Sequence, residues 1–191
     1  DIGALVLRGF PLDEGELGPT PAHWNAAANP EAHRQEVVLL LCGALLGDPF
    51  AWTTQQAGQL VHNILPMKAY THEQVGFSSK ELLTWHTEDA FHPLRPDYLA
   101  LMCLRNPDFV ATLVGSIRQL NLPDDIVDAL FDCHFTIRPD KSHLEGGVVE
   151  ESSLAHKRMK ALNESPPPIA VLYGDRKDPY LRVDPYFMER P

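Results

Sequence analysis

Residues 85–97 read WHTEDAFHPLRPD and directly precede the apolar run YLALMCL at 98–104. Within this stretch, His86 and Glu88 stand two residues apart. Because residues i and i+2 of an extended chain point to the same face, the imidazole and the carboxylate can converge on one ion. The stretch therefore predicts a strand edge that carries a metal-binding pair.

One His-x-Glu pair alone is a weak signal, and the chain has a second one at His143 and Glu145. A surface or hydrogen-bonding role is the alternative for either pair. The apolar ELLTW at 81–85 precedes His86, whereas His143 lies between polar sequences, so we favour His86 and Glu88. Two imidazoles and one carboxylate on one face of Fe(II) leave its other positions open for oxygen and an organic co-substrate. This pair would supply two of those three ligands.

The composition limits the class of protein. The length of 191 residues favours one domain, and 26 acidic against 16 basic residues give a net charge of −10. This charge disfavours nucleic acid and anionic membrane as partners and mildly favours cationic ligands, although an acidic surface can simply serve solubility.

The longest apolar run, at 37–47, is too short to span a bilayer. The three cysteines, Cys42, Cys103 and Cys133, are expected to be reduced core thiols of a cytoplasmic protein.

Short apolar runs with turn residues between them predict a mainly β fold, an antiparallel double sheet of sandwich or jelly-roll type. Helices are expected at 31–46 and 124–131, and the polar stretch at 148–165 is expected to be helical or mobile and to form a lid. The predicted strands are 3–9, 49–53, 58–66, 82–86, 98–106, 110–115, 134–139, 169–174 and 179–184.

Four separated motifs together point to a known family. They are AWTTQQAG at 51–58, WHTEDAFHPLRPDYLALMCLRNPD at 85–108, IRPDKSH at 137–143 and GDRKDPYLRVDPYFM at 174–188. With them the chain resembles the clavaminate-synthase-like group of Fe(II)/2-oxoglutarate oxygenases. Within that group it is similar to the free amino-acid β-hydroxylases of arginine and enduracididine. The resemblance covers essentially the whole chain and implies a double-stranded β-helix (jelly-roll) with a few flanking helices.

The resemblance also implies the cofactors and the residues that hold them. Fe(II) is the metal, 2-oxoglutarate and O2 are the co-substrates, and His86 and Glu88 correspond to the family's catalytic iron ligands. Thr112, in VATLVG, corresponds to the threonine that helps to hold the 2-oxoglutarate carboxylate. A threonine in a strand can equally be a strand former and nothing more.

A second set of residues corresponds to the family's substrate contacts. Gln55 and Glu88 would hold the amino-acid head group, while Asp140, Ser142 and Asp184 would face the guanidinium. A planar cation with paired donors requires carboxylates placed to accept them. Read without the resemblance, Gln55 is a polar loop residue, and the two aspartates are turn formers.

Three features depart from the family's pattern. Tyr186 stands where arginine hydroxylases can carry a second Asp, which puts unmodified arginine in doubt, and Phe109 replaces the usual Gly after NPD. The family's second iron-binding His and its anchoring Arg residues are expected on strands after position 191. The chain is therefore expected to be a single oxygenase domain over 1–191 that is incomplete at both ends.

The resemblance thus implies β-carbon hydroxylation of a free guanidino amino acid, arginine or an enduracididine-like molecule, in the biosynthesis of a specialised metabolite such as an antibiotic. The expected partner is this small molecule, with no nucleic acid and no membrane, and a homodimer stays open. Two alternatives remain: an amino-acid-binding member of the same fold without a complete iron site, and a zinc hydrolase that uses the same His-x-Glu pair.

Overall fold

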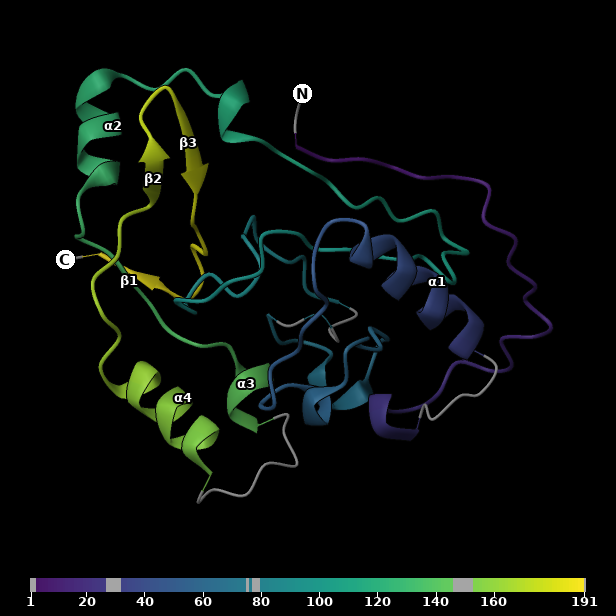
Figure 1. Ribbon diagram of the computed structural model, residues 1–191. Coiled ribbons are helices and arrows are strands. Elements are labelled where there is room, and N and C mark those ends of the chain that lie inside the picture. Colours follow the sequence, from purple (N-terminus) through teal and green to yellow (C-terminus); the bar gives the residue numbers. More distant parts are fainter. Residues whose placement is uncertain (1–2, 27–31, 75, 77–79, 146–152, 191) are drawn as a thin grey trace.

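The computed structural model describes residues 3–26, 32–74, 76, 80–145 and 153–190. Helices and short strands alternate with long irregular segments (Figure 1). The α-helices are α1 (His33–Ala44), α2 (Asp124–Phe131), α3 (Lys141–Glu145) and α4 (Leu154–Glu164), and the strands are β1 (Thr136–Ile137), β2 (Leu172–Asp175), β3 (Asp178–Leu181) and β4 (Met188–Glu189). Single turns of 3-10 helix lie at Trp24–Ala26, Gln56–Gly58, Lys68–Tyr70 and Ile117–Gln119.

The strands form two antiparallel pairs. β2 pairs with β3, with Leu172 opposite Leu181, and β1 pairs with β4, with Ile137 opposite Met188. The β2–β3 hairpin and α2 lie together at one end of the molecule (Figure 1). There Arg118 holds Asp178 of β3 through two hydrogen bonds of 2.6 Å. The C-terminal third of the chain is therefore the most regular part.

A buried apolar cluster connects this region to the segment that follows His86 and Glu88. Its buried members are Ala90, Phe91, Ile137, Met159 and Ile169. A smaller cluster of Trp24, Leu65 and Met67 lies elsewhere in the fold. Because Ala90 and Phe91 belong to the main core, the chain that carries the predicted metal pair is anchored at its C-terminal side.

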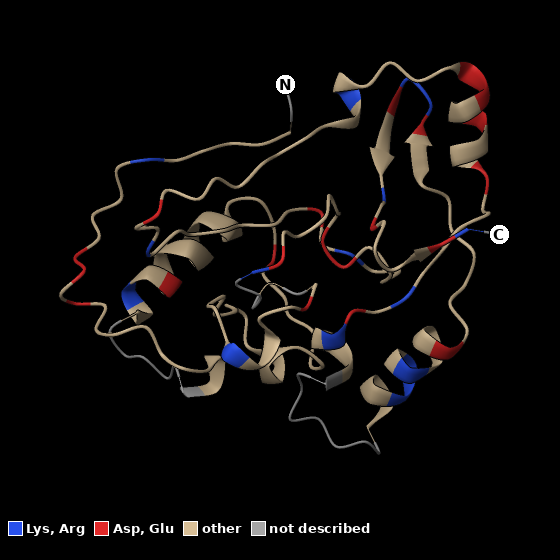
Figure 2. Cartoon of the chain, turned by 180° about the vertical axis from the view of Figure 1, so that it is seen from behind, with Lys and Arg blue, Asp and Glu red and all other residues tan. Residues whose placement is uncertain are grey.

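The predicted helices are confirmed. α1 occupies 33–44 of the predicted 31–46, α2 has the predicted bounds, and α4 lies within 148–165. Asp124 and Asp125 place negative charge in the first turn of α2, where the helix dipole favours it, and Figure 2 shows red, acidic positions along the ribbon of this helix. The hydroxyl of Ser153 caps α4 by accepting the backbone N–H of His156 at 3.1 Å. The first part of the predicted lid, 146–152, lies outside the described residues.

The predicted strands are only partly found. Strand pairing occurs in the last three predicted runs, at 136–137, 172–175 and 178–181, while 3–9, 49–53, 58–66, 82–86, 98–106 and 110–115 contain no strand. A strand requires a neighbour that satisfies its backbone groups, and these runs have no such ladder within the described residues. The described part of the chain contains two-stranded sheets and no closed barrel, so it does not by itself establish the double-stranded β-helix.

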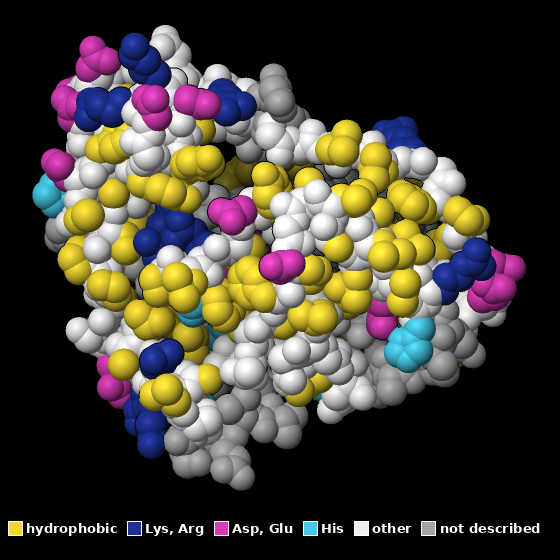
Figure 3. Space-filling model, in the orientation of Figure 1, with side chains coloured by type: hydrophobic (Ala, Val, Ile, Leu, Met, Phe, Trp, Pro, Cys, Tyr) yellow, Lys and Arg dark blue, Asp and Glu magenta, His cyan; other side chains and the backbone are white. Residues whose placement is uncertain are grey.

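Two further expectations concern the cysteines and the membrane. All three cysteines are free, but Cys103 and Cys133 are exposed, so the expectation of core thiols was wrong for these two. Apolar residues near Cys103 lie on the surface too: Leu99 and Leu101 are 58% and 68% exposed, and Figure 3 shows many hydrophobic side chains among polar ones on the face in view. None of the helices in the described residues is long and apolar enough to cross a membrane.

Leu172 is 1% exposed and tests the importance of the β2–β3 hairpin. We expect Leu172→Ala to lower the free energy of unfolding by about 2–5 kcal/mol, because the cavity cannot refill. The matched control Leu154→Ala, at a side chain that is 64% exposed, should change it by less than about 0.5 kcal/mol. Urea denaturation followed by circular dichroism measures both, and equal losses would contradict this role for Leu172.

Candidate metal and substrate site

The structure brings His86 and Glu88 together. The Nε2 atom of His86 lies 3.9 Å from Oε2 of Glu88, and the two side chains are 35% and 41% exposed. The Nδ1–H of His86 donates to the carbonyl of Thr84 at 2.7 Å. This hydrogen bond fixes the tautomer that leaves Nε2 unprotonated, which is the form that binds a metal.

Thr87 holds this segment in place between the two candidate ligands. Its backbone N–H donates to the carbonyl of Val183 at 2.8 Å, and its hydroxyl accepts the N–H of Val183 at 3.1 Å. Thr87 is thus bonded to the segment of Asp184, while His86 and Glu88 share the opposite side. The expected alternation of i and i+2 is present, although no strand is formed here.

Acidic groups gather around the pair. Burial raises the pKa of Glu88, and the charges of Asp89 and Asp140 raise it further, against the opposing effect of His86. Burial also raises the pKa of Asp184, again opposed by His86 and increased by Asp140. Four of the predicted site residues therefore lie close enough to affect one another electrostatically, which is what a site for a cation requires.

Two more predicted residues meet beside α3. The side-chain amide of Gln55 donates to the hydroxyl of Ser142 at 2.8 Å, and the backbone N–H of Ser142 donates to Oδ1 of Asp140 at 2.7 Å. Residues that are 87 positions apart in sequence are thus brought into direct contact. The structure therefore brings Gln55 beside Ser142 and Asp140, although the resemblance assigned Gln55 to the head group and the other two to the guanidinium.

Thr112 is the exception. It lies in an exposed irregular segment, and within the described residues no hydrogen bond links it to the other predicted site residues. The same segment does approach the site at Gly115, where an added Cβ would lie 3.3 Å from Cζ3 of Trp85. The segment of Thr112 thus packs against the residue that precedes His86.

Four side chains that sequence reasoning did not assign form a buried hydrogen-bonded group behind the pair. Asp89 accepts the indole N–H of Trp52 at 2.7 Å on Oδ2 and lies 2.8 Å from Nε2 of His143 on Oδ1. The other ring nitrogen of His143 lies 3.0 Å from the hydroxyl of Thr54. His143 was expected in a polar loop, but it lies on α3 and is 2% exposed. The signal that could have found it is its place in the IRPDKSH motif.

The backbone is strained on both sides of this group. Asp89 has φ of 46°, and Gln56 and Ala57 have φ of 40° and 57°. The left-handed region is unfavourable for residues with a Cβ and persists only where the surroundings enforce it. Gln56 is held by two hydrogen bonds to the backbone of Asn63, at 2.9 and 3.1 Å. Such strain next to predicted site residues is typical of functional loops.

The donors present fit part of a metal site. An imidazole with a fixed tautomer and a carboxylate facing it match two positions of a facial triad of two histidines and one carboxylate. Within the described residues no group of three or more His, Cys, Asp or Glu is arranged to hold a metal. The two donors are therefore compatible with iron, and the third ligand is not among the described residues.

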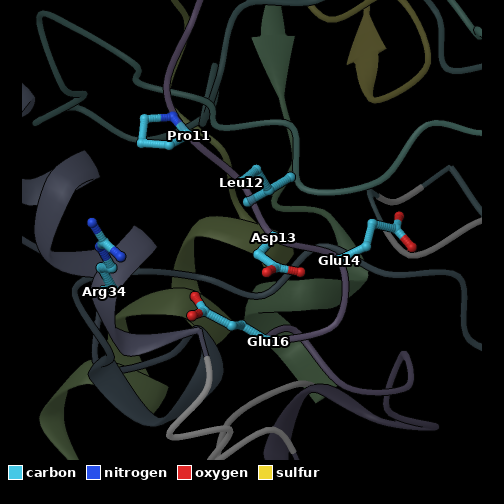
Figure 4. Close-up of a pocket in the computed structure, with 6 residues that line it drawn as sticks. All are labelled: Pro11, Leu12, Asp13, Glu14, Glu16 and Arg34. Atoms are coloured by element: carbon cyan, nitrogen blue, oxygen red, sulfur yellow. The ribbon is translucent and has the colours of Figure 1, made fainter.

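A separate surface pocket of about 490 Å³ contains none of these residues. It is formed by the N-terminal segment and Arg34 of α1, and Figure 4 shows Asp13 and Glu16 turned toward the same space. Its lining residues are Pro11, Leu12, Asp13, Glu14, Glu16 and Arg34. The pocket is not part of the predicted site.

Comparison with known proteins identifies homologues. No family model matches the sequence. Enduracididine beta-hydroxylase of Streptomyces hygroscopicus is 46% identical over 98% of this chain and 58% of its own length. L-ornithine/L-arginine 3-hydroxylase of Catenulispora acidiphila is 44% identical over 96% of this chain and 57% of its own. Clavaminate synthase 2 of Streptomyces clavuligerus is 33% identical over 95% of this chain and 53% of its own. The chain is a homologue of the clavaminate-synthase-like oxygenases.

Solved structures agree with this homology. The non-haem iron oxygenase OrfP, crystallised with Fe, succinate and (3S)-hydroxy-L-Arg, superposes with a TM-score of 0.86 at 43% identity. The match covers 96% of this chain and 56% of that structure. The chain therefore spans a little over half the length of these clavaminate-synthase-like proteins.

His92 generates a pH prediction for this region. Its ring lies 3.8 Å from that of Trp52, and burial lowers its pKa, although Asp89 opposes this effect. A histidine whose pKa is lowered by folding binds fewer protons when folded than when unfolded. The contribution of the neutral His92 ring to the free energy of unfolding is therefore complete above the unfolded pKa of about 6.5. It is lost as the pH falls below that value.

We expect His92→Asn to make the unfolding free energy less dependent on pH between about 7.5 and 5, while its amide oxygen can still accept the N–H of Leu94. The reference is the wild-type chain, measured in parallel. Urea denaturation at several pH values measures both, and an unchanged slope in His92→Asn would refute the prediction.

Proposed function

We propose that this chain belongs to an Fe(II)/2-oxoglutarate-dependent oxygenase that hydroxylates the β-carbon of a free guanidino amino acid, arginine or an enduracididine-like molecule. The observation that carries the proposal is the facing pair of His86 Nε2 and Glu88 Oε2, 3.9 Å apart, beside the carboxylates of Asp140 and Asp184. The relatives support it, since two of them are named as hydroxylases of enduracididine and of ornithine and arginine.

His86 and Glu88 would hold the iron, with a third ligand from elsewhere in the longer protein. When bound, iron activates O2 together with 2-oxoglutarate: one oxygen atom enters succinate as CO2 leaves, and the other becomes the hydroxyl of the product. Thr112 would help to bind 2-oxoglutarate. Its support is the homology and the packing of its segment against Trp85 through Gly115.

The protein's own task is to place one C–H bond at the metal. Gln55 and Glu88 would hold the amino-acid head group, and Asp140, Ser142 and Asp184 would hold the guanidinium. The contact of Gln55 with Ser142 supports one shared substrate site. Neighbouring carboxylates with raised pKa repel one another until a cation enters, which favours a positively charged side chain.

We further propose that the fold is a double-stranded β-helix and that the chain is part of one oxygenase domain. The OrfP match supports this, as do the apolar runs at 98–104 and 110–114, which are exposed without strand partners in the described residues. Paired with strands from the rest of the longer protein, these runs would form the sheets that the sequence predicts.

Metal binding tests the first part of the proposal. In the longer protein under nitrogen, Fe(II) with 2-oxoglutarate should give a metal-to-ligand absorption band, which fades in His86→Ala and Glu88→Ala. Removal of a residue that only hydrogen-bonds to a metal ligand lowers metal affinity about 10- to 100-fold. Removal of a ligand itself should lower it at least as much. In air, the wild type should add one oxygen to arginine or enduracididine with release of succinate.

Three outcomes would contradict this assignment. Amino-acid binding without the band or turnover would support a binding protein, and turnover without oxygen or keto acid would support a hydrolase. Unchanged iron affinity in Glu88→Ala would exclude Glu88 as an iron ligand.

Asp184 tests the substrate class. We expect Asp184→Asn to raise the KM for the guanidino amino acid roughly 10- to 100-fold, because a charge-assisted hydrogen bond is weakened. Discrimination against the neutral analogue citrulline should fall by a similar factor. The control is Asp175→Asn, at an exposed hairpin position. Steady-state kinetics measure both variants, and unchanged discrimination in Asp184→Asn would exclude contact with the guanidinium.

A further inference from the structure

Asp89 and His143 make a buried contact that the proposed chemistry does not use. His143 has no exposed side-chain surface and that of Asp89 is 6% exposed. Burial alone would raise the pKa of Asp89, but the hydrogen bonds from His143 and Trp52 outweigh it and hold the pKa low. Each oxygen of this carboxylate accepts one hydrogen bond, from Trp52 at 2.7 Å and from Nε2–H of His143 at 2.8 Å.

The tautomer of His143 follows from these partners. With Nε2 donating to Asp89, the neutral ring accepts the hydroxyl proton of Thr54 at Nδ1, across 3.0 Å. The ring also meets Phe91 edge-on, with centroids 4.8 Å apart and planes at 75°. A ring held at both nitrogens and along one edge has a single orientation.

One end of this chain of hydrogen bonds fixes the metal pair. Asp89 directly follows Glu88 and has the left-handed φ of 46°. Three hydrogen bonds maintain that conformation. Two reach the side chain of Asp89, and the third runs from the N–H of His92 to the carbonyl of Asp89 at 2.8 Å. Because the backbone turns at Asp89, the direction of the Glu88 carboxylate depends on these bonds.

The other end fixes the substrate side. Thr54 and His143 are the sequence neighbours of Gln55 and Ser142, which are themselves joined at 2.8 Å. Two parallel hydrogen bonds thus connect the turn at 54–55 to α3, one buried and one facing the site. Displacement of His143 would move Ser142 relative to Glu88.

We propose that Asp89, His143 and Thr54 form a positioning relay that holds the metal-binding loop and the substrate-binding α3 in one alignment. The inference rests on the proposed function for its consequence, but the relay itself is a property of the chain without metal. The three residues are positioning residues, because their side chains are bonded to one another behind the pair.

The test is a matched set of variants in the longer protein. Thr54→Val removes the donor at constant shape, and Thr54→Ser retains it. Gln56→Met is the structural control. Gln56 is as buried as Thr54, but its side chain makes its two hydrogen bonds to the backbone of Asn63 and none to the relay. All variants are measured well below their melting temperatures.

We expect Thr54→Val to raise the KM for the amino acid and the share of 2-oxoglutarate consumed without hydroxylation, each by roughly tenfold. The KM for the keto-acid co-substrate should stay unchanged. Thr54→Ser should restore both values, and Gln56→Met should lower only the melting temperature. Equal coupling in Thr54→Val and the wild type, equal uncoupling in Gln56→Met, or no rescue by Thr54→Ser would overturn the relay.

A second readout does not depend on the reaction. In the metal-free protein, ¹H–¹⁵N spectra of the imidazoles should show His143 protonated at Nε2, with a slowly exchanging proton that becomes fast in Thr54→Val. The opposite tautomer, or unchanged exchange, would overturn the relay even if hydroxylation is confirmed. The expected spectra with no turnover in the wild type would instead reject the proposed function alone.

Discussion

The carboxylate of Asp89 is the interaction on which the site depends. It accepts hydrogen bonds from Trp52 and His143, which come from two different segments, while its own backbone turns directly after Glu88. A buried charge is tolerated only when its hydrogen-bonding capacity is satisfied, so the three segments must stay together for this group to remain buried. Loss of one donor would leave one oxygen of a buried carboxylate without its hydrogen bond, and this requirement makes the arrangement specific.

Arg182 provides a second attachment for the same segment. Its guanidinium donates to the carbonyls of Ala90 and Phe91, at 2.5 and 2.9 Å, and burial lowers its pKa to about 10. The neighbouring Val183 pairs with Thr87. The LRVD motif therefore has two roles: Arg182 and Val183 bind the metal-pair segment, and this places Asp184 beside His86. A motif whose aspartate is assigned to substrate binding thus also serves to assemble the site.

The outcome for individual residues follows from the range of the interactions involved. His86 and Glu88 could be paired from sequence because their convergence depends only on the local direction of an extended chain. Gln55 and Ser142 could be placed together only through the family resemblance, since nothing local relates residues 87 positions apart. His143 was set aside because its sequence neighbours are polar, yet its burial is decided by Asp89 and Thr54, which contact it from far along the chain.

The sequence by itself predicted α1, α2 and α4, the convergence of His86 and Glu88, and the homology to oxygenases, because capping, spacing and motifs are short-range or inherited patterns. It did not predict α3. It also predicted apolar strands, but strands form only when partners satisfy their backbone groups, and for the runs at 98–104 and 110–114 the described residues contain no such partner. Only the tertiary structure decided which carboxylate faces solvent and which is enclosed. Glu88 and Asp89 are adjacent acids, and one remains partly exposed beside His86 while the other is buried, because Trp52 and His143 from distant segments enclose the carboxylate of Asp89.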